Sequence, residues 1–576
     1  MKTLSRTTLH MTGSKRTALD MARGRIVLIS AIFVISFIIV AGRALDVAVI
    51  QGTWGQGQET RTSLLEHKNE KTATVRHDIV DRHGVILARS LKTASLYADP
   101  KIITHPETVA KDLTAIFKDM SYGDTLKKLQ EDKRFVWIKR NLTPDEQYKI
   151  LYLGHPGLSF QEEERRVYPQ GELAAHVVGI TNVDGGGLSG IEASFNKYLG
   201  QGTSPLALTL DMRLQHVLKR EISYAMTKHR AIGGAGLIMD VRNGEILAAV
   251  SLPDFDPNLS GDVKDVKRFN RLTLGVYEPG STFKLFTTAA YLEKNKNGLG
   301  DKFDATQPLV FGRFKINDYH AEDRLMNVAE IFMHSSNIGS ALMGHKVGTK
   351  DFKDLLSDLG LMTAPDIEIA EISAPLIPQN WGDINTATAA FGHGIAVSPV
   401  QLVSAAASVM NGGIKVKPTF ILNRDIENKR GIRVVSPETA HHIRQLMRLV
   451  VTDGTGSKAD VVGYHVGGKT GTAEKNTRGG YDKNRLVSSF LGVFPSESPQ
   501  YALYIMIDEP KPTKDTYGYA TGGWVAAPAV RKTIESMVAI LGMEPQEPKD
   551  DLKGSLARYV PPKEKINMQK VSHETE

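Results

Sequence analysis

An uncharged stretch of 17 residues, Ile26–Gly42, restricts the fold of this chain more than any other feature. It reads IVLISAIFVISFIIVAG, and Ser30 and Ser36 are its only polar side chains. As a helix it would be roughly 26 Å long, close to the ~30 Å hydrocarbon core of a bilayer. An arginine at each end can extend toward the lipid headgroups. The pattern predicts a single N-terminal transmembrane helix over residues 26–45.

The charges before this stretch predict its orientation. The tail, residues 1–25, has a single acid, Asp20, and its basic residues near the stretch are Lys2, Arg6, Lys15, Arg16, Arg23 and Arg25. The positive-inside rule therefore places the tail in the cytoplasm and everything after the stretch on the extracytoplasmic side of the membrane. A cleaved signal peptide is one alternative, but its apolar part is shorter and Gly42-Arg43-Ala44 is a poor cleavage site. A buried core helix is the other.

The composition excludes several classes of function. The chain has 576 residues, enough for two or three domains, and no cysteine, which removes thiol nucleophiles, Cys-zinc sites and disulfides. The His-Glu-x-x-His motif does not occur, and the 17 histidines have no ligand-like spacing, so we expect no metal and no organic cofactor. The net charge of +7 is a mild excess over this length, which does not favour nucleic-acid binding.

The remainder of the chain divides into two parts with different sequence patterns, followed by a short tail. Residues 46–205 contain a strand–turn–strand pattern at Val75–Leu87 and a polar, helix-like stretch at 105–155, without obvious catalytic residues. Residues 206–545 alternate strand-like and helix-like segments, which indicates an α+β domain. Residues 546–576 are rich in Lys, Glu, Asp and Pro and are expected to be flexible. The strands predicted in the second domain are Gly236–Asp240, Glu245–Leu252, Leu486–Val493 and Tyr501–Ile507, and the helices are Ser281–Lys294, Asn327–Met333, Asp351–Leu359, Val400–Met410 and Pro437–Val451.

Three short motifs of the second domain have residues suited to chemistry. In the first, Pro279-Gly280 predicts a turn and Ser281 begins a helix, with Lys284 over the same face. Unsatisfied N–H groups and the helix dipole at that position favour an oxyanion next to a nucleophilic serine. A simple N-cap serine is the alternative interpretation.

The second motif is Ser335-Ser336-Asn337, between a helix predicted to end near Met333 and another predicted to begin near Ile338. Serine and asparagine are common in turns between helices, because their side chains hydrogen-bond to nearby backbone groups. Taken alone, this motif therefore indicates a polar cap as readily as a site.

The third motif is Gly468-Lys469-Thr470-Gly471-Thr472. Residues 463–470 also match G-x-x-x-x-G-K-[ST], the phosphate-binding loop, which requires a helix directly afterwards. Gly471 and the following Thr-Ala-Glu-Lys-Asn-Thr-Arg-Gly-Gly do not favour a helix. We predict a strand instead, where Gly471 lets a substrate backbone approach the strand edge.

Together, S-x-x-K, S-x-N and K-T-G in this order are typical of penicillin-binding proteins and class A β-lactamases. The chain resembles class B penicillin-binding proteins, and the Ser-Ser-Asn and Lys-Thr-Gly-Thr-Ala forms are similar to the division-specific FtsI type. The supporting stretches are Arg165–Gly171, Gly179, Gly190–Glu192, Gly244–Ala248, Pro253, Asp256–Asn258, Asn270-Arg271, Gly392–Ile395, Ser398–Leu402 and Ala526–Pro528.

This resemblance implies an architecture. Residues 46–205 would be an elongated, β-rich, non-catalytic pedestal of the dimerisation type. Residues 206–545 would be a transpeptidase domain, with a central antiparallel sheet flanked by helices as in serine β-lactamases. The glycosyltransferase signature of the bifunctional relatives is absent from the sequence. Strand polymerisation would therefore belong to a partner, an FtsW-type glycosyltransferase, with other divisome proteins as further partners.

The resemblance also implies a reaction. Ser281 would attack the D-Ala-D-Ala terminus of a peptidoglycan stem peptide, and an amine of a neighbouring stem would take the acyl group and form a cross-link. Lys284 would be the base, which requires its pKa to fall roughly 3 units below ~10.4, about 4 kcal/mol. β-Lactams would acylate the same serine.

The other site residues have implied roles as well. Ser335 would relay a proton, and Asn337 would hydrogen-bond the substrate amide. Lys469, Thr470 and Thr472 would bind the terminal carboxylate, although a flat strand places both threonines on the face opposite Lys469. The backbone N–H groups of Ser281 and Thr472 would form the oxyanion hole.

Several alternatives remain open at this point. One is an elongation-type class B transpeptidase, and another is a catalytically silent penicillin-binding sensor or scaffold on the same fold. A serine-type D,D-carboxypeptidase would instead release D-Ala to water.

Overall fold

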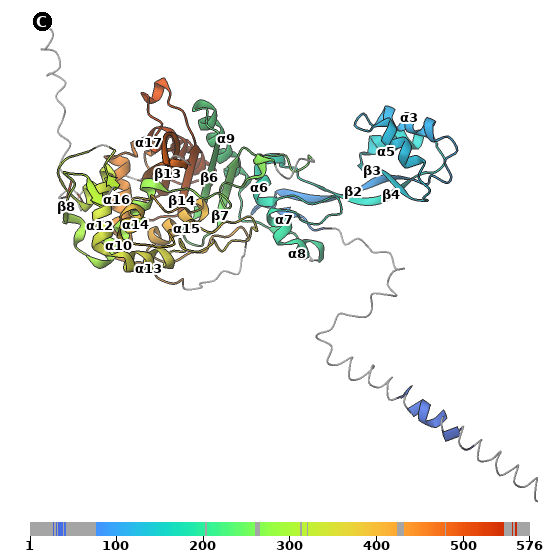
Figure 1. The fold of residues 1–576 in the computed structure, drawn as a ribbon, viewed down its shortest axis with the longest axis horizontal. Helices are drawn as coiled ribbons and strands as arrows, with labels where there is room; N and C mark the ends of the chain where they lie inside the picture. The colour runs from blue at the N-terminus through green and yellow to red at the C-terminus, as the bar shows by residue number, and fades with distance from the viewer. Residues whose placement is uncertain are drawn as a thin grey trace, which may run out of the picture. The chain divides into compact units, whose positions relative to one another are not determined.

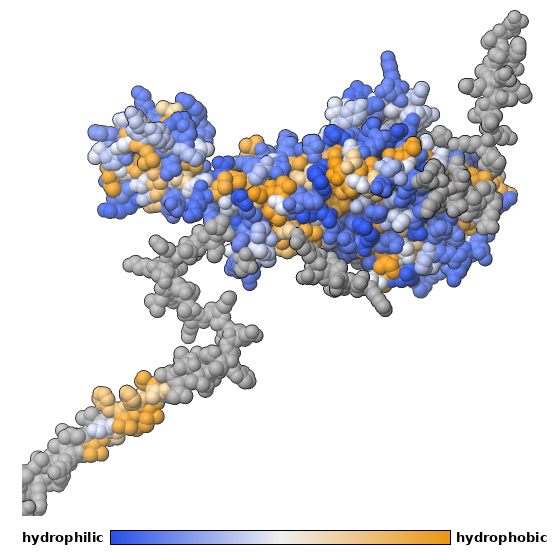
Figure 2. All heavy atoms as spheres, turned by 180° about the vertical axis from the view of Figure 1, so that it is seen from behind, coloured by the Kyte–Doolittle hydropathy of each residue, from blue (hydrophilic) through white to orange (hydrophobic). Residues whose placement is uncertain are grey.

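The structure is a computed structural model, and it describes most of the chain from Arg76 onward. The described residues are 27, 30–31, 33–38, 40–41, 76–201, 204–259, 265–311, 314–319, 321–422, 431–477, 480–546, 556 and 559–560. The transmembrane prediction for 26–45 lies in part outside them. Its described residues have helical backbone and exposed apolar side chains (Figure 2). Among all described residues, no helix is both long enough and apolar enough to cross a bilayer.

Backbone contacts divide the chain into two units, Met1–Ala73 and Thr74–Glu576, and every labelled element of Figure 1 lies in the second. The pedestal region contains a five-stranded sheet of order β3-β2-β1-β5, in which β4 also pairs with β2. β2 and β4 are antiparallel from Arg89 opposite Val167 to Ala98 opposite Leu158. The elements are β1 (Ile79–Val80), β2 (Ile86–Ala98), α3 (Pro106–Ile116), α4 (Tyr122–Leu129), β3 (Val136–Leu142), α5 (Pro144–Leu153), β4 (Leu158–Val167), α6 (Ala175–Val178), α7 (Gly190–Ser194), α8 (Asn196–Gln201) and β5 (Leu206–Ala207).

A buried ionic cluster of Arg76, Arg166 and Glu192 links three separate segments of the pedestal region. Glu192 is fully buried and accepts hydrogen bonds from Arg76 Nε and Arg166 Nε, each at 2.7 Å. Arg76 also donates to the Glu192 carbonyl, and Arg166 donates to the Arg76 carbonyl. A buried carboxylate is tolerated because two guanidinium groups share it.

The second domain is built on one antiparallel sheet of order β12-β13-β14-β6-β7, so β12 is an edge strand. Its strands are β6 (Gly233–Asp240), β7 (Ile246–Leu252), β12 (Gly467–Thr477), β13 (Gly480–Phe494) and β14 (Tyr501–Asp508). Its helices are α9 (Met212–Lys228), α10 (Lys284–Lys294), α11 (Val328–His334), α12 (Asn337–Val347), α13 (Thr349–Asp358), α14 (Asp383–Ala389), α15 (Pro399–Met410), α16 (Pro437–Thr452) and α17 (Gly522–Leu541). Four short strands, β8 (Lys302–Asp304), β9 (Leu309–Phe311), β10 (Phe314–Ile316) and β11 (Leu325–Asn327), form two small antiparallel sheets, β9 with β10 and β8 with β11.

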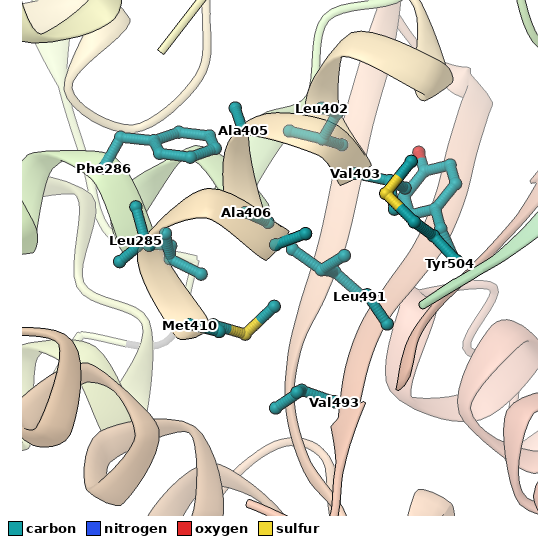
Figure 3. Close-up of a cluster of buried hydrophobic side chains, with 14 of the residues drawn as sticks. Leu285, Phe286, Leu402, Val403, Ala405, Ala406, Met410, Leu491, Val493 and Tyr504 are labelled. Carbon is teal, nitrogen blue, oxygen red and sulfur yellow. The ribbon is translucent and has the colours of Figure 1, made fainter. Parts of the chain in front are cut away.

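Two hydrophobic cores cover the two faces of this sheet. On one face, Phe490, Leu503 and Ile505 pack with apolar residues of α9 and α17, which lie together in Figure 1. On the other face, Leu491 and Tyr504 pack with α10 and α15. Figure 3 shows this second core, where side chains of both helices meet those of β13 and β14. Successive residues of a strand point to opposite faces. Because β13 is apolar on both faces, its side chains pack against the helices on both sides of the sheet.

Several predicted elements differ from the structure. The helix-like stretch 105–155 also contains the strand β3, in which Val136, Ile138 and Leu142 are buried. α9 and α17, which cover a whole face of the sheet, had no counterpart among the predicted elements. The tail was predicted to be flexible from residue 546. However, Leu556 is buried, and Asn327 Nδ2 donates to the Tyr559 carbonyl at 2.6 Å, so these residues pack against the domain.

Candidate active site

Ser281 lies in a tight turn that precedes α10. The structure has a 3₁₀ turn over Gly280–Phe283, and the α-helix begins at Lys284, slightly later than predicted. Gly280 has φ +53°, and a side chain there would place Cβ 2.7 Å from the Thr472 carbonyl oxygen. Only glycine lets the turn lie this close to β12. The fully buried Phe283 then anchors the turn in the core.

The second motif lies at the junction of two helices. α11 ends at His334, and Ser335 adopts the left-handed conformation, with φ 63° and ψ 41°. Ser336 is the N-cap of α12 and accepts a hydrogen bond from the Gly339 N–H. A non-glycine residue at positive φ is uncommon and is often found at functional sites. This conformation presents both the carbonyl and the hydroxyl of Ser335 to α10.

Lys284 connects the first motif to the second. Its Nζ is hydrogen-bonded to the Ser335 carbonyl at 2.5 Å and to Asn337 Oδ1 at 2.8 Å, and it lies 3.2 Å from Ser335 Oγ. In the described part of the chain, Lys284 therefore bonds to the second motif and not to the Ser281 hydroxyl. Catalytic hydrogen bonds are often long before substrate binds, so this geometry is compatible with a base that turns toward Ser281.

Lys469 connects the third motif to the same hydroxyl. β12 is a strand through Gly471, as the sequence predicts, and Lys469 Nζ donates to Ser335 Oγ at 2.8 Å. Lys284 and Lys469 are both fully buried. The structure thus brings the three motifs together at one site. Gly471 of the third motif lies against the turn that holds Ser281, and Ser335 Oγ lies between the two amines.

Burial changes the ionisation of both amines. Burial lowers the pKa of Lys284 well below its ordinary value, the positive charge of Lys469 lowers it further, and Asp318 opposes the shift. Burial alone lowers the pKa of Lys469 to about 7. Both shifts favour the neutral form of the amine, and a neutral amine can act as a base.

The remaining residues of the third motif have other partners. Thr470 Oγ1 is 2.8 Å from Thr455 Oγ1, and Thr472 Oγ1 accepts from the Gly522 N–H at 3.1 Å. Both threonines thus bond away from Ser335, as the strand pleat predicts. The predicted approach of a substrate backbone at Gly471 stays a prediction. The structure adds an internal reason for glycine there, because a Cβ would crowd Thr282 and Ser489.

Sequence reasoning gave no role to four residues beside this site, Glu278, Asp318, His393 and Tyr481, although His393 lies in the stretch Gly392–Ile395 that supports the family resemblance. Glu278 accepts from the Gly394 N–H at 3.0 Å and from Tyr481 OH at 2.8 Å, which ties the β12–β13 hairpin to the Ser281 turn. His393 packs against Tyr481, and burial, aided by the charge of Lys284, lowers its pKa to about 4. Asp318 caps α12. These contacts join residues far apart in sequence, so no local pattern could indicate them.

Within the described residues, no group of three or more His, Asp or Glu side chains is arranged to hold a metal ion. The polar groups at Ser281 are instead hydroxyls, amines and an amide. A serine beside a buried amine can take an acyl group, because the amine can accept the serine proton as the new bond forms.

Comparisons with known proteins agree with this fold and site. Residues 234–535 match the penicillin-binding protein transpeptidase domain, and residues 71–204 match the penicillin-binding protein dimerisation domain. The chain is 38% identical to the probable peptidoglycan D,D-transpeptidase FtsI of Caulobacter vibrioides, over 81% of this chain and 82% of that protein. It is 30% identical to the peptidoglycan D,D-transpeptidase FtsI of Escherichia coli, over 83% and 85%.

A solved structure of penicillin-binding protein 3 from Mycobacterium tuberculosis, complexed with aztreonam, shares the fold. Its TM-score is 0.65 at 24% identity, over 83% of this chain and 98% of that chain. The transpeptidase and dimerisation domains occur in one chain, and the identity to FtsI proteins extends over most of its length. The chain therefore belongs to the class B penicillin-binding proteins, of the FtsI type.

The close approach of β12 to the Ser281 turn can be tested at Gly471. In Gly471→Ala, the new Cβ would lie 2.9 Å from Thr282 Cγ2 and 3.2 Å from the Pro279 carbonyl oxygen. Overpacking of this kind costs about 1–3 kcal/mol, so we expect labelling by a fluorescent penicillin to slow roughly tenfold. Gly123→Ala, on α4 with only Ser121 Oγ at 3.9 Å, is the control and should label at the normal rate. Equal rates for the two variants would contradict the packing argument.

Proposed function

We propose that this chain is a serine peptidoglycan D,D-transpeptidase that cross-links stem peptides of the septal wall during cell division. One observation carries the proposal: Ser335 Oγ is joined to both buried amines, and one of them, Lys284, begins the helix that follows the Ser281 turn. The names of the relatives, peptidoglycan D,D-transpeptidase FtsI, support the substrate and the role in division.

In the proposed first step, Ser281 Oγ attacks the carbonyl carbon of the penultimate D-Ala. The C–O bond forms as the serine proton passes to the neutral amine of Lys284. The C–N bond to the last D-Ala then breaks, and Ser335 supplies a proton to the leaving amine. The proton taken up by Lys284 replaces the one that Ser335 gave away. The amine of a second stem then forms a C–N bond to the acyl carbon, the C–O bond to Ser281 breaks, and the proton of that amine returns to Ser281 Oγ through Lys284. A β-lactam would follow only the first step and remain bound to Ser281.

Substrate binding follows from the same geometry. Lys469 lies on an edge strand, so a stem peptide can pair with β12 and direct its terminal carboxylate to this end of the pocket. Thr470 and Thr472 lie on the same strand, and we assign them, with Gly471, to substrate binding. Asn337 contributes its amide, and the backbone N–H groups of Ser281 and Thr472 would stabilise the oxyanion.

The proposed location is the inner membrane, with a single anchor at residues 26–45, the N-terminus in the cytoplasm and the catalytic domain in the periplasm. The uncharged stretch and the basic tail before it support this location. An FtsW-type glycosyltransferase that supplies new glycan, and other divisome proteins, are the proposed partners. Because water can replace the acceptor amine, a D,D-carboxypeptidase activity belongs to the proposal as a side reaction.

The nucleophile can be tested by covalent labelling. A fluorescent penicillin should label the full-length protein, and Ser281→Ala should abolish the label because no acyl bond can form. Lys284→Ala should slow labelling by about 10²–10⁴-fold, since the general base is lost. Measured rates on gels, with intact mass to locate the adduct, check both. Labelling that survives in Ser281→Ala would disprove the assignment of the nucleophile.

Transfer to an amine can be separated from hydrolysis by product analysis. The full-length protein, supplied with lipid II and an FtsW-type glycosyltransferase, should yield cross-linked stem dimers after muramidase digestion. Ser281→Ala should yield none, while the glycan strands still form. Release of D-Ala without dimers would identify a carboxypeptidase instead.

The role in division can be tested in cells. Depletion of the protein should give filaments, because septal cross-linking stops while elongation continues. Swollen or rounded cells would indicate the elongation type. Cells of normal shape with unchanged cross-link content would favour the catalytically silent alternative.

A further inference from the structure

Asp318 lies beside the second motif, in the segment that follows β10. Its carboxylate accepts hydrogen bonds from Ser336 Oγ at 2.7 Å, from the Ile338 N–H at 3.0 Å and from the Asn337 N–H. It thus satisfies free N–H groups in the first turn of α12, where a negative charge is favourable. Its three bonds hold the residues on either side of the Asn337 side chain.

The same segment fixes the orientation of the Asn337 side chain. Asn337 Nδ2 donates to the Asn317 carbonyl at 3.0 Å, which turns Oδ1 toward Lys284, 2.8 Å from its Nζ. Asp318 and Lys284 are therefore linked through a single residue. The contacts of Asn337 with Asn317 and with Lys284 both require its side chain to keep this orientation.

The charges that face Lys284 come from three elements. Lys469 on β12 lowers the pKa of Lys284, and Asp318 raises it. His393, in the loop after α14, has a pKa of about 4 and is neutral at pH 7. In the described part of the chain, Asp318 is thus the carboxylate that offsets burial and the second amine.

We propose that Asp318 is a positioning residue for the acylation step: its carboxylate fixes Asn337, which bonds to the Lys284 amine, and places a negative charge one residue away from the amine that deprotonates Ser281. This inference rests on the proposed function. A buried amine without a nearby carboxylate is neutral over a wider pH range but is a weaker base. Asp318 therefore makes Lys284 a stronger base, while it reduces the fraction of Lys284 that is neutral at a given pH.

The sign of the pH effect follows from this. Acylation requires neutral Lys284, so its rate rises with pH through the pKa of that amine. Asp318→Asn removes a negative charge, which lowers the pKa of Lys284, so the rise should move to lower pH by roughly one unit. The maximal rate at high pH should fall, because the amine is a weaker base. A purely structural role would lower the maximum and leave the midpoint unchanged.

The experiment measures the second-order rate of labelling by a fluorescent penicillin from pH 5 to 10. It compares the full-length protein with Asp318→Asn and with Asp318→Ser, a second neutral variant in case the first does not fold. Ser336→Ala, which removes one hydrogen bond to Asp318 but keeps its charge, is the matched control for the midpoint. Asp145→Asn, an exposed acid on α5, controls for net charge.

A midpoint that moves down in the two neutral variants and stays in place in both controls would support the inference. An unchanged midpoint in a folded neutral variant would overturn it and leave the proposed function intact. Absence of labelling at Ser281 in the unaltered protein would overturn the proposed function and this inference together.

Discussion

Two lysine amines buried against one serine hydroxyl are the interaction on which the rest of this structure depends. Lys284, Lys469 and Ser335 come from three elements, α10, β12 and the α11–α12 junction. Burying an ammonium group costs several kcal/mol when it is unpaired, so the fold provides polar oxygens around these amines and lowers their pKa values. A site that tolerates neutral amines is therefore also a site with a base at neutral pH.

Close backbone approach brings these elements together. The Gly280 N–H donates to the Gly392 carbonyl at 3.1 Å, and the Ser281 turn lies against Thr472 of β12. Gly280 and Gly392 both have positive φ, and a Cβ at either would contact backbone atoms of the facing segment. The sheet and the core shown in Figure 3 provide the rigid frame to which these glycine contacts attach. Side-chain packing thus holds the sheet and the helices in place. The glycines, which have no side chain, allow the short backbone distances within the site.

The sequence predicted the parts of the site that depend on local patterns. Pro279-Gly280 predicted the turn before α10, and the Ser-Ser-Asn stretch predicted the junction of two helices. α9 and α17 were not predicted, and the catalytic roles given to Ser281, Asn337 and Lys469 remain predictions. The contacts of Asp318 and Glu278 could not be predicted, since each joins segments brought together only by tertiary folding.

Counting donors around Lys284 indicates how the site works. A neutral amine has two N–H donors and one lone pair. The Ser335 carbonyl and Asn337 Oδ1 can only accept, so they take both donors. Ser335 Oγ lies 3.2 Å from Lys284 Nζ and accepts from Lys469 Nζ at 2.8 Å, so this hydroxyl joins the two amines. This arrangement agrees with the proposed role of Ser335 in proton transfer. In the proposed reaction, Lys284 would exchange its contact with Ser335 for one with the Ser281 hydroxyl, and Ser335 would stay beside the leaving amine.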